Sequence, residues 1–144
     1  MIEATPFRPP WALGDNVGRM ASSTGQGNRV LVVEDDPDIR GALCECLGLE
    51  GFEVLSASDG EEALARLTEE PLPHAIVLDM VMPILDGPGT LERLRSNAAW
   101  SRIPVVLASA DPAASRTAER HVSKPYRVSE LVAVLGELVS AGSR

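Results

Sequence analysis

Residues 29–39 read RVLVVEDDPDI, and this stretch decides the fold. It opens with an apolar, valine-rich run, which is typical of a strand covered on both faces of a sheet. Asp36 and Pro37 then form the pattern of a helix start, with a carboxylate at the N-cap and a proline at the first helical position. The stretch therefore predicts a buried strand that passes straight into a helix and leaves two carboxylates, Glu34 and Asp35, at the junction.

The same alternation continues along the rest of the chain. Apolar runs of strand length alternate with amphipathic runs of helix length, which is the pattern of βαβ units around a parallel sheet. The predicted strands are residues 29–33, 52–57, 74–78, 103–108 and 121–123. The predicted helices begin after Asp36 and Asp59 and lie near residues 89–96, 112–120 and 128–140, the fourth shortened to about two turns. We therefore expect an α/β fold with a doubly wound, five-stranded parallel sheet of the flavodoxin-like kind, in the order 2-1-3-4-5, with helices on both faces.

The first part of the chain differs in composition from the rest. Residues 1–28 carry Pro, Gly, Ser and Asn without helical or strand periodicity, and they are expected to form a flexible N-terminal extension. Met20 lies within it and leaves open a later start of translation. A total of 144 residues suits one domain, which we expect to span residues 29–141.

Composition and charge exclude several classes of protein. The chain is 44% hydrophobic and 24% charged, which is ordinary for a soluble globular domain. Its net charge is −8, and no run of Lys or Arg could form a footprint on a phosphate backbone, so direct nucleic-acid binding is not expected. The absence of a long apolar stretch and of a secretory signal predicts a cytoplasmic protein without a membrane segment. Cys44 and Cys46 lie two residues apart in a predicted helix and do not face each other, so neither a disulfide nor a metal pair is expected.

Chemically capable residues follow four of the five predicted strands. Glu34 and Asp35 come after the first strand, Asp79 after the third, Ser109 after the fourth and Lys124 after the fifth. Because the carboxyl ends of parallel strands meet at one edge of a sheet, we expect all five side chains to gather there.

Three carboxylates at one edge require a positive counter-charge. At an effective dielectric constant of about 20, each pair of carboxylates about 4 Å apart repels by roughly 4 kcal/mol. Lys124 supplies only one positive charge, whereas a hard divalent cation takes oxygen ligands readily, and Mg²⁺ fits best. A carboxylate held against Mg²⁺, beside an ammonium and a hydroxyl, is arranged to attack phosphorus and form an acyl phosphate.

Four segments together resemble a known family. VLVVEDDPDIR, IVLDMVMPILDG, VVLASAD and HVSKPY are similar to the successive signatures of response-regulator receiver domains, and the resemblance covers about residues 29–140. It implies a phosphorylation-switched receiver of a two-component or phosphorelay system. In such a receiver Asp79 would be the phosphoacceptor, while Glu34, Asp35, Asp79 and the backbone carbonyl of Val81 would hold Mg²⁺.

The resemblance also implies roles around the phosphoryl group. Lys124 would contact that group, aimed by a cis peptide bond to Pro125. Ser109 would turn its hydroxyl toward it in the active state, and the backbone N–H of Ala110 would be a further donor. Ser109 and His121 are the switch candidates, and the alternative is that the switch is read on another face.

The sequence departs from the family pattern at several positions. Glu34 stands where Asp is more usual, Ser109 where Thr is frequent, and His121 where the family often has Tyr or Phe. The segment between Ser109 and Lys124 is about two helical turns shorter than usual. The first two changes preserve the chemistry, whereas the shortened segment affects the face through which receivers usually signal.

The resemblance implies protein partners and leaves two alternatives open. A histidine kinase or phosphotransfer protein would donate the phosphoryl group and a downstream protein would receive the signal. A homodimer is possible, no output domain is expected after the last helix, and no enzymatic activity is expected beyond slow self-dephosphorylation. One alternative is a hydrolase of the haloacid-dehalogenase kind, although Val81 stands where its second carboxylate would be. The other is a switch-impaired receiver that serves as a constitutive docking or dimerisation module, which the shortened segment favours and the intact acceptor set opposes.

Overall fold

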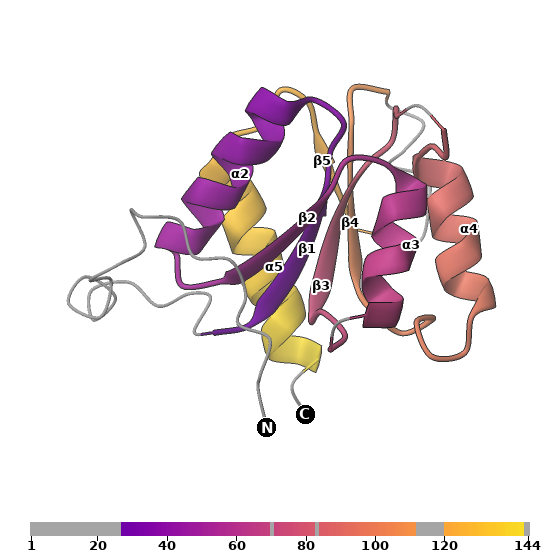
Figure 1. The fold of residues 1–144 in the computed structure, drawn as a ribbon. Coiled ribbons are helices and arrows are strands. Elements are labelled where there is room, and N and C mark those ends of the chain that lie inside the picture. The colour runs from indigo at the N-terminus through magenta and orange to yellow at the C-terminus, as the bar shows by residue number, and fades with distance from the viewer. Residues whose placement is uncertain (1–26, 70, 83, 112–119, 143–144) are drawn as a thin grey trace.

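The computed structural model describes residues 27–69, 71–82, 84–111 and 120–142. Its centre is one sheet of five parallel strands in the order β2-β1-β3-β4-β5, as predicted (Figure 1). The strands are β1 (Arg29–Val33), β2 (Glu53–Ala57), β3 (Ala75–Asp79), β4 (Val105–Ser109) and β5 (Arg120–Ser123). The α/β fold class and the strand order are therefore confirmed.

Four described helices cover the two faces of this sheet. They are α2 (Pro37–Leu49), α3 (Gly60–Glu69), α4 (Gly87–Ser96) and α5 (Val128–Gly142). Helices α2 and α5 lie on one face, and α3 and α4 lie on the other (Figure 1). The shortened helix predicted near residues 112–120 and the predicted extension at residues 1–28 fall almost wholly outside the described residues.

The core is aliphatic and has two layers, because successive strand residues face opposite sides of the sheet. On one side Val30 and Val32 of β1 pack with Leu43 and Leu47 of α2 and with residues of α5. On the other side Leu31 and Val33 of β1 pack with residues of α3 and α4. All residues of the central strands β3 and β4 are buried, as expected for strands covered on both faces.

Carboxylates fix the starts of the helices. The Oδ1 atom of Asp36 accepts hydrogen bonds from the backbone N–H groups of Asp38 at 2.9 Å and Ile39 at 3.2 Å, which confirms the predicted N-cap. Asp86 caps α4 in the same way, accepting from Gly89 N at 2.9 Å. The prediction placed the start of that helix near residue 89, two residues too late.

Two strand ends also differ slightly from the prediction. Asp79 and Ser109 are the last residues of β3 and β4 rather than the first residues after them. The reason is that both pair in the ladder, Asp79 with Ala108 and Ser109 with Ser123. Their side chains are consequently held by the sheet itself.

Two predictions of absence can be compared with the described residues. Cys44 and Cys46 are free and half-buried on α2, so no disulfide joins them. Within the described ranges, none of the helices combines the length and the apolar character needed to cross a membrane.

Helix α4 begins in direct contact with the backbone that leaves β3. Gly87 N donates to the carbonyl of Met80 at 3.2 Å. A Cβ atom added to Gly87 would lie 2.5 Å from Met80 Cα and 2.8 Å from the carbonyl oxygen of Asp79. Both neighbours are backbone atoms, so this close approach requires glycine.

We expect Gly87→Ala to lower the free energy of unfolding by about 1–3 kcal/mol, the usual cost of overpacking. Gly41→Ala is the matched control, because Gly41 lies in α2 with nothing within 4 Å of an added Cβ atom. In the control, helix propensity alone should raise the free energy of unfolding, by up to about 1 kcal/mol. Urea denaturation of both variants measures the difference, and equal effects of the two substitutions would contradict the close packing of Gly87.

Candidate functional site

Three carboxylates gather at the carboxyl edge of the sheet. Glu34, Asp35 and Asp79 each offer an oxygen, and these atoms lie within 4.8 Å of one another. Glu34 and Asp79 are each only 4% exposed, whereas Asp35 is open to solvent. The sheet places them together because β1 and β3 are neighbours and Val33 pairs with Leu78, one residue before each acid. The predicted gathering of these three side chains is confirmed.

Lys124, the residue directly after β5, joins the same cluster. Its Nζ atom lies 3.1 Å from Asp79 Oδ1, and the same oxygen accepts a hydrogen bond from Val81 N at 3.2 Å. The backbone N–H of Lys124 donates to the carbonyl of Ser109 at 2.9 Å, and the peptide bond from Lys124 to Pro125 is cis, as predicted. Asp79 therefore lies between one ammonium group and one backbone N–H.

The acid cluster carries more negative charge than its neighbours offset. The pKa of Glu34 is raised from 4.5 to about 7, first by burial and then by the negative charge of Asp79. A hydrogen bond from Asp36 N at 3.3 Å and the charge of Lys124 act in the opposite direction without overcoming these effects. A carboxylate that resists ionisation here indicates a site suited to an additional cation.

Mg²⁺ fits this donor set. Hard divalent cations prefer carboxylate and carbonyl oxygens, and three carboxylate oxygens already lie close together. Glu34 is held by Asp36 N, and Asp79 by Lys124 and Val81 N. Two of the three acids are therefore oriented by other groups of the chain.

Ser109 and Ala110 lie at the end of β4. Ser109 is buried, and its Oγ atom accepts a hydrogen bond from Asp111 N at 2.9 Å. Ala110 follows directly and is exposed. Their predicted contacts with a phosphoryl group remain predictions, since this bond orients the Ser109 hydroxyl toward its own loop.

His121 is half-buried in β5, opposite Leu107 of β4, two residues before the pair formed by Ser123 and Ser109. Alternate residues of a strand share a face, so His121 and Ser109 lie on the same side of the sheet. The Nε2 atom of His121 is 3.5 Å from Ser123 Oγ. This placement is compatible with a coupled movement, which stays a prediction.

Two residues near the cluster were missed by the sequence reasoning. Arg40 of α2 donates from Nη1 to the backbone carbonyl of Glu34 at 2.9 Å. Tyr126 is half-buried against the core, and its pKa is raised by burial and then by the charges of Glu34 and Asp79. The only sequence signals were an arginine one turn into the helix and an aromatic residue directly after Lys-Pro.

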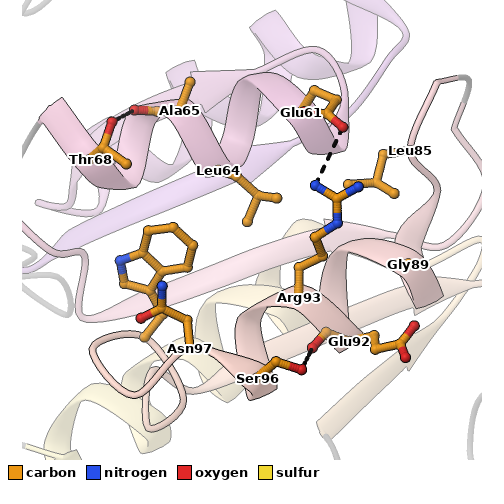
Figure 2. A pocket seen from close by; sticks show the side chains of 11 residues that line it. Glu61, Leu64, Ala65, Thr68, Leu85, Gly89, Glu92, Arg93, Ser96 and Asn97 are labelled. Atoms are coloured by element: carbon orange, nitrogen blue, oxygen red, sulfur yellow. Dashed lines mark hydrogen bonds and ion pairs between the residues drawn. The ribbon is translucent and has the colours of Figure 1, made fainter.

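A separate groove of about 910 Å³ lies between α3 and α4 (Figure 2). Leu64, Leu85 and Trp100 contribute to its lining, and Arg93 pairs across it with Glu61 at 3.6 Å. None of the predicted site residues lines this groove. This groove and the chemically capable cluster are thus different places on the molecule.

Comparisons with known proteins agree with this arrangement. The family model of the response regulator receiver domain matches residues 30–136. The transcriptional regulatory protein PrrA of Mycobacterium tuberculosis is 43% identical over an alignment of 112 residues, and the match covers 73% of this chain and 47% of PrrA. The chain therefore spans about half the length of this curated relative.

Solved structures show the same fold. The signal receiver domain of a histidine kinase from Syntrophus aciditrophicus aligns with a TM-score of 0.74 and 26% identity, over 82% of this chain and 94% of that one. The receiver domain of the sensor histidine kinase PA1611 from Pseudomonas aeruginosa, which holds a magnesium ion in its active-site cleft, aligns with a TM-score of 0.67 and 25% identity, over 79% and 98% of the two chains. Because the family match covers most of the chain and the strand order agrees, this chain belongs to the response regulator receiver domain family of two-component systems.

Proposed function

We propose that Asp79 accepts a phosphoryl group from a histidine kinase or a phosphotransfer protein, and that this step depends on Mg²⁺. The observation that carries the proposal is the cluster in which Asp79 lies 3.1 Å from the Lys124 ammonium and within 4.8 Å of oxygens of Glu34 and Asp35. An oxygen of Asp79 would bond to phosphorus as the phosphorus–nitrogen bond of phosphohistidine breaks. The products are an aspartyl phosphate and a free histidine.

The residues around Asp79 have separable tasks in this proposal. Glu34, Asp35 and Asp79, with the carbonyl of Val81, would hold Mg²⁺, whose positive charge when bound offsets the carboxylates and the phosphoryl oxygens. Lys124 orients the Asp79 carboxylate and would move to the phosphoryl oxygens once they arrive. Positioning and charge stabilisation account for most of the catalysis in phosphoryl transfer, so these groups suffice.

At the end of β4, two further groups would stabilise the product. The Ser109 hydroxyl would give up its hydrogen bond with Asp111 N and donate to a phosphoryl oxygen instead. The backbone N–H of Ala110 would donate a second hydrogen bond to the phosphoryl group. The change at Ser109 would reach the neighbouring strand at His121. The phosphorylated domain would then signal through protein contacts, with no enzymatic activity beyond slow self-dephosphorylation.

Apolar side chains beside the site suit a protein donor. Ile39 in the first turn of α2 is 45% exposed, and Val81 and Ile84 in the loop between β3 and α4 are each 78% exposed. These segments leave the carboxyl ends of neighbouring strands, so a donor that approaches Asp79 meets them.

We propose a downstream protein as the target and leave open a homodimer. Absence of direct nucleic-acid binding by this domain remains a prediction that rests on its net charge of −8.

One alternative keeps a specific observation in its favour. The segment between Ser109 and Lys124 is short, which favours a switch-impaired docking or dimerisation module. The hydrolase alternative rested on Asp79 and on the predicted Mg²⁺ ligands. The match to the receiver family covers these residues and therefore favours a receiver over a hydrolase. Phosphorylation chemistry separates the two remaining candidates.

Incubation with acetyl phosphate and Mg²⁺ should add one phosphoryl group to the protein, measured as intact mass. Asp79→Asn should abolish the adduct, because the amide is not a nucleophile toward phosphorus, and omission of Mg²⁺ should do the same. Asp59→Asn is the matched control, since Asp59 caps α3 and lies outside the cluster. A protein that acquires no adduct from acetyl phosphate or from histidine kinases would be a docking module instead.

The stability of the protein should depend jointly on pH and Mg²⁺. Folding raises the pKa of Glu34 from 4.5 to about 7, so the metal-free protein loses stability as pH rises through that interval. Mg²⁺ needs the ionised carboxylate, so its stabilising effect should be larger at about pH 8.5 than at about pH 5.5. Thermal unfolding with and without Mg²⁺ at both pH values measures this, and Glu34→Gln should reduce the difference. An increase in Tm that is the same at both pH values would contradict the assignment of Glu34.

A further inference from the structure

Arg40 donates two hydrogen bonds to the junction between β1 and α2. Its backbone N–H donates to the carbonyl of Asp36 at 2.8 Å, which is the first bond of the helix. Its side chain turns back, and Nη1 donates to the carbonyl of Glu34 at 2.9 Å. Arg40 is half-buried, so this bond is partly shielded from water.

The carbonyl of Glu34 is the place where the junction needs a donor. The N–H of Glu34 still pairs with the carbonyl of Ala57 at 3.1 Å, at the end of the ladder with β2. The carbonyl of Glu34 lies beyond that ladder, and a backbone acceptor left without a partner in a shielded place costs free energy. The guanidinium supplies a charged donor, which forms one of the stronger kinds of hydrogen bond.

This bond also fixes the peptide plane between Glu34 and Asp35. Rotation of that plane changes ψ of Glu34 and φ of Asp35 together, and therefore the directions of both side chains. The Nη1 atom of Arg40 donates to a backbone oxygen and not to a carboxylate oxygen. Arg40 thus acts on the acid pair through its backbone.

We propose that Arg40 is a positioning residue that orders Glu34 and Asp35 for Mg²⁺ without contacting the ion. The proposal rests on the proposed function, because it assigns Arg40 to the same metal site. Groups that orient metal ligands typically contribute about 10-fold to 100-fold in metal affinity. Loss of the Arg40 side chain should therefore weaken Mg²⁺ binding and leave the transfer step itself intact.

The chain contains a matched control for a merely structural bond. Arg66 of α3 donates from Nε to the carbonyl of Ser56 in β2, also at 2.9 Å and also partly buried. Ser56 is not part of the cluster formed by Glu34, Asp35 and Asp79. Arg66→Met therefore removes a bond of the same kind and length one strand away from the candidate metal site.

The experiment compares the wild-type chain, Arg40→Met, Arg40→Lys and Arg66→Met. The dissociation constant for Mg²⁺ is measured by titration calorimetry without any phosphodonor, below the Tm of every variant. Arg40→Met should raise this constant about 10-fold, and Arg66→Met should change it by less than about twofold. Arg40→Lys keeps a donor on a long stem, so its constant should lie closer to the wild-type value than that of Arg40→Met.

A second readout separates binding from chemistry. The rate of labelling by acetyl phosphate is followed against Mg²⁺ concentration, and at saturating Mg²⁺ Arg40→Met should reach the wild-type rate within about twofold. A Mg²⁺ dissociation constant unchanged in Arg40→Met, raised equally in Arg66→Met, or not improved in Arg40→Lys would overturn the positioning role. If no protein is labelled at all, the proposed phosphoacceptor function fails, while the calorimetric comparison still decides the role of Arg40.

Discussion

The parallel pairing of β1 with β3 is the constraint on which the site depends. Val33 lies opposite Leu78 in this register, so the next residues of the two strands, Glu34 and Asp79, emerge side by side. Two carboxylates that are 45 positions apart along the chain are thereby held within 4.8 Å. A slip of one residue would turn the side chains of β1 to the opposite face and separate the acids, while also exposing its apolar residues. The core that stabilises the fold is therefore also what holds the acids together.

Holding these acids together acts against the stability of the domain. Burial and the charge of Asp79 both oppose ionisation of Glu34, and Lys124 is a single positive charge against three carboxylates. The surrounding structure tolerates this because the central strands are fully buried on both faces. Natural proteins frequently retain such destabilising groups where function requires them. The electrostatic imbalance thus indicates a site suited to a cation rather than a defect in packing.

The sequence predicted most of the fold because its signals are local. Strand-length apolar runs, the Asp36-Pro37 helix start and the order of the motifs were enough for the five strands and their arrangement. Boundaries shifted where tertiary pairing decided them, as for Ser109, which the ladder with β5 draws into β4. The same sequence could not show that Asp86 begins a helix rather than a turn, because Asp-Gly is a signal for both. The bond from Arg40 to the carbonyl of Glu34 was beyond reach for a different reason, since it depends on the rotamer of one long side chain.

The junction between β1 and α2 shows how closely support and chemistry are combined. Within seven consecutive residues, Glu34 and Asp35 supply carboxylates to the cluster, Asp36 caps the helix, and Arg40 returns to the carbonyl of Glu34. Asp36 also donates from its backbone to Glu34 Oε2, so its N–H orients an acid while its side chain starts the helix. Two bonds of the junction thus act directly on Glu34, one from Asp36 N and one from Arg40 Nη1. A substitution of Asp36 or Arg40 therefore acts on fold and site together, and only measurements that separate metal binding from unfolding can distinguish the two effects.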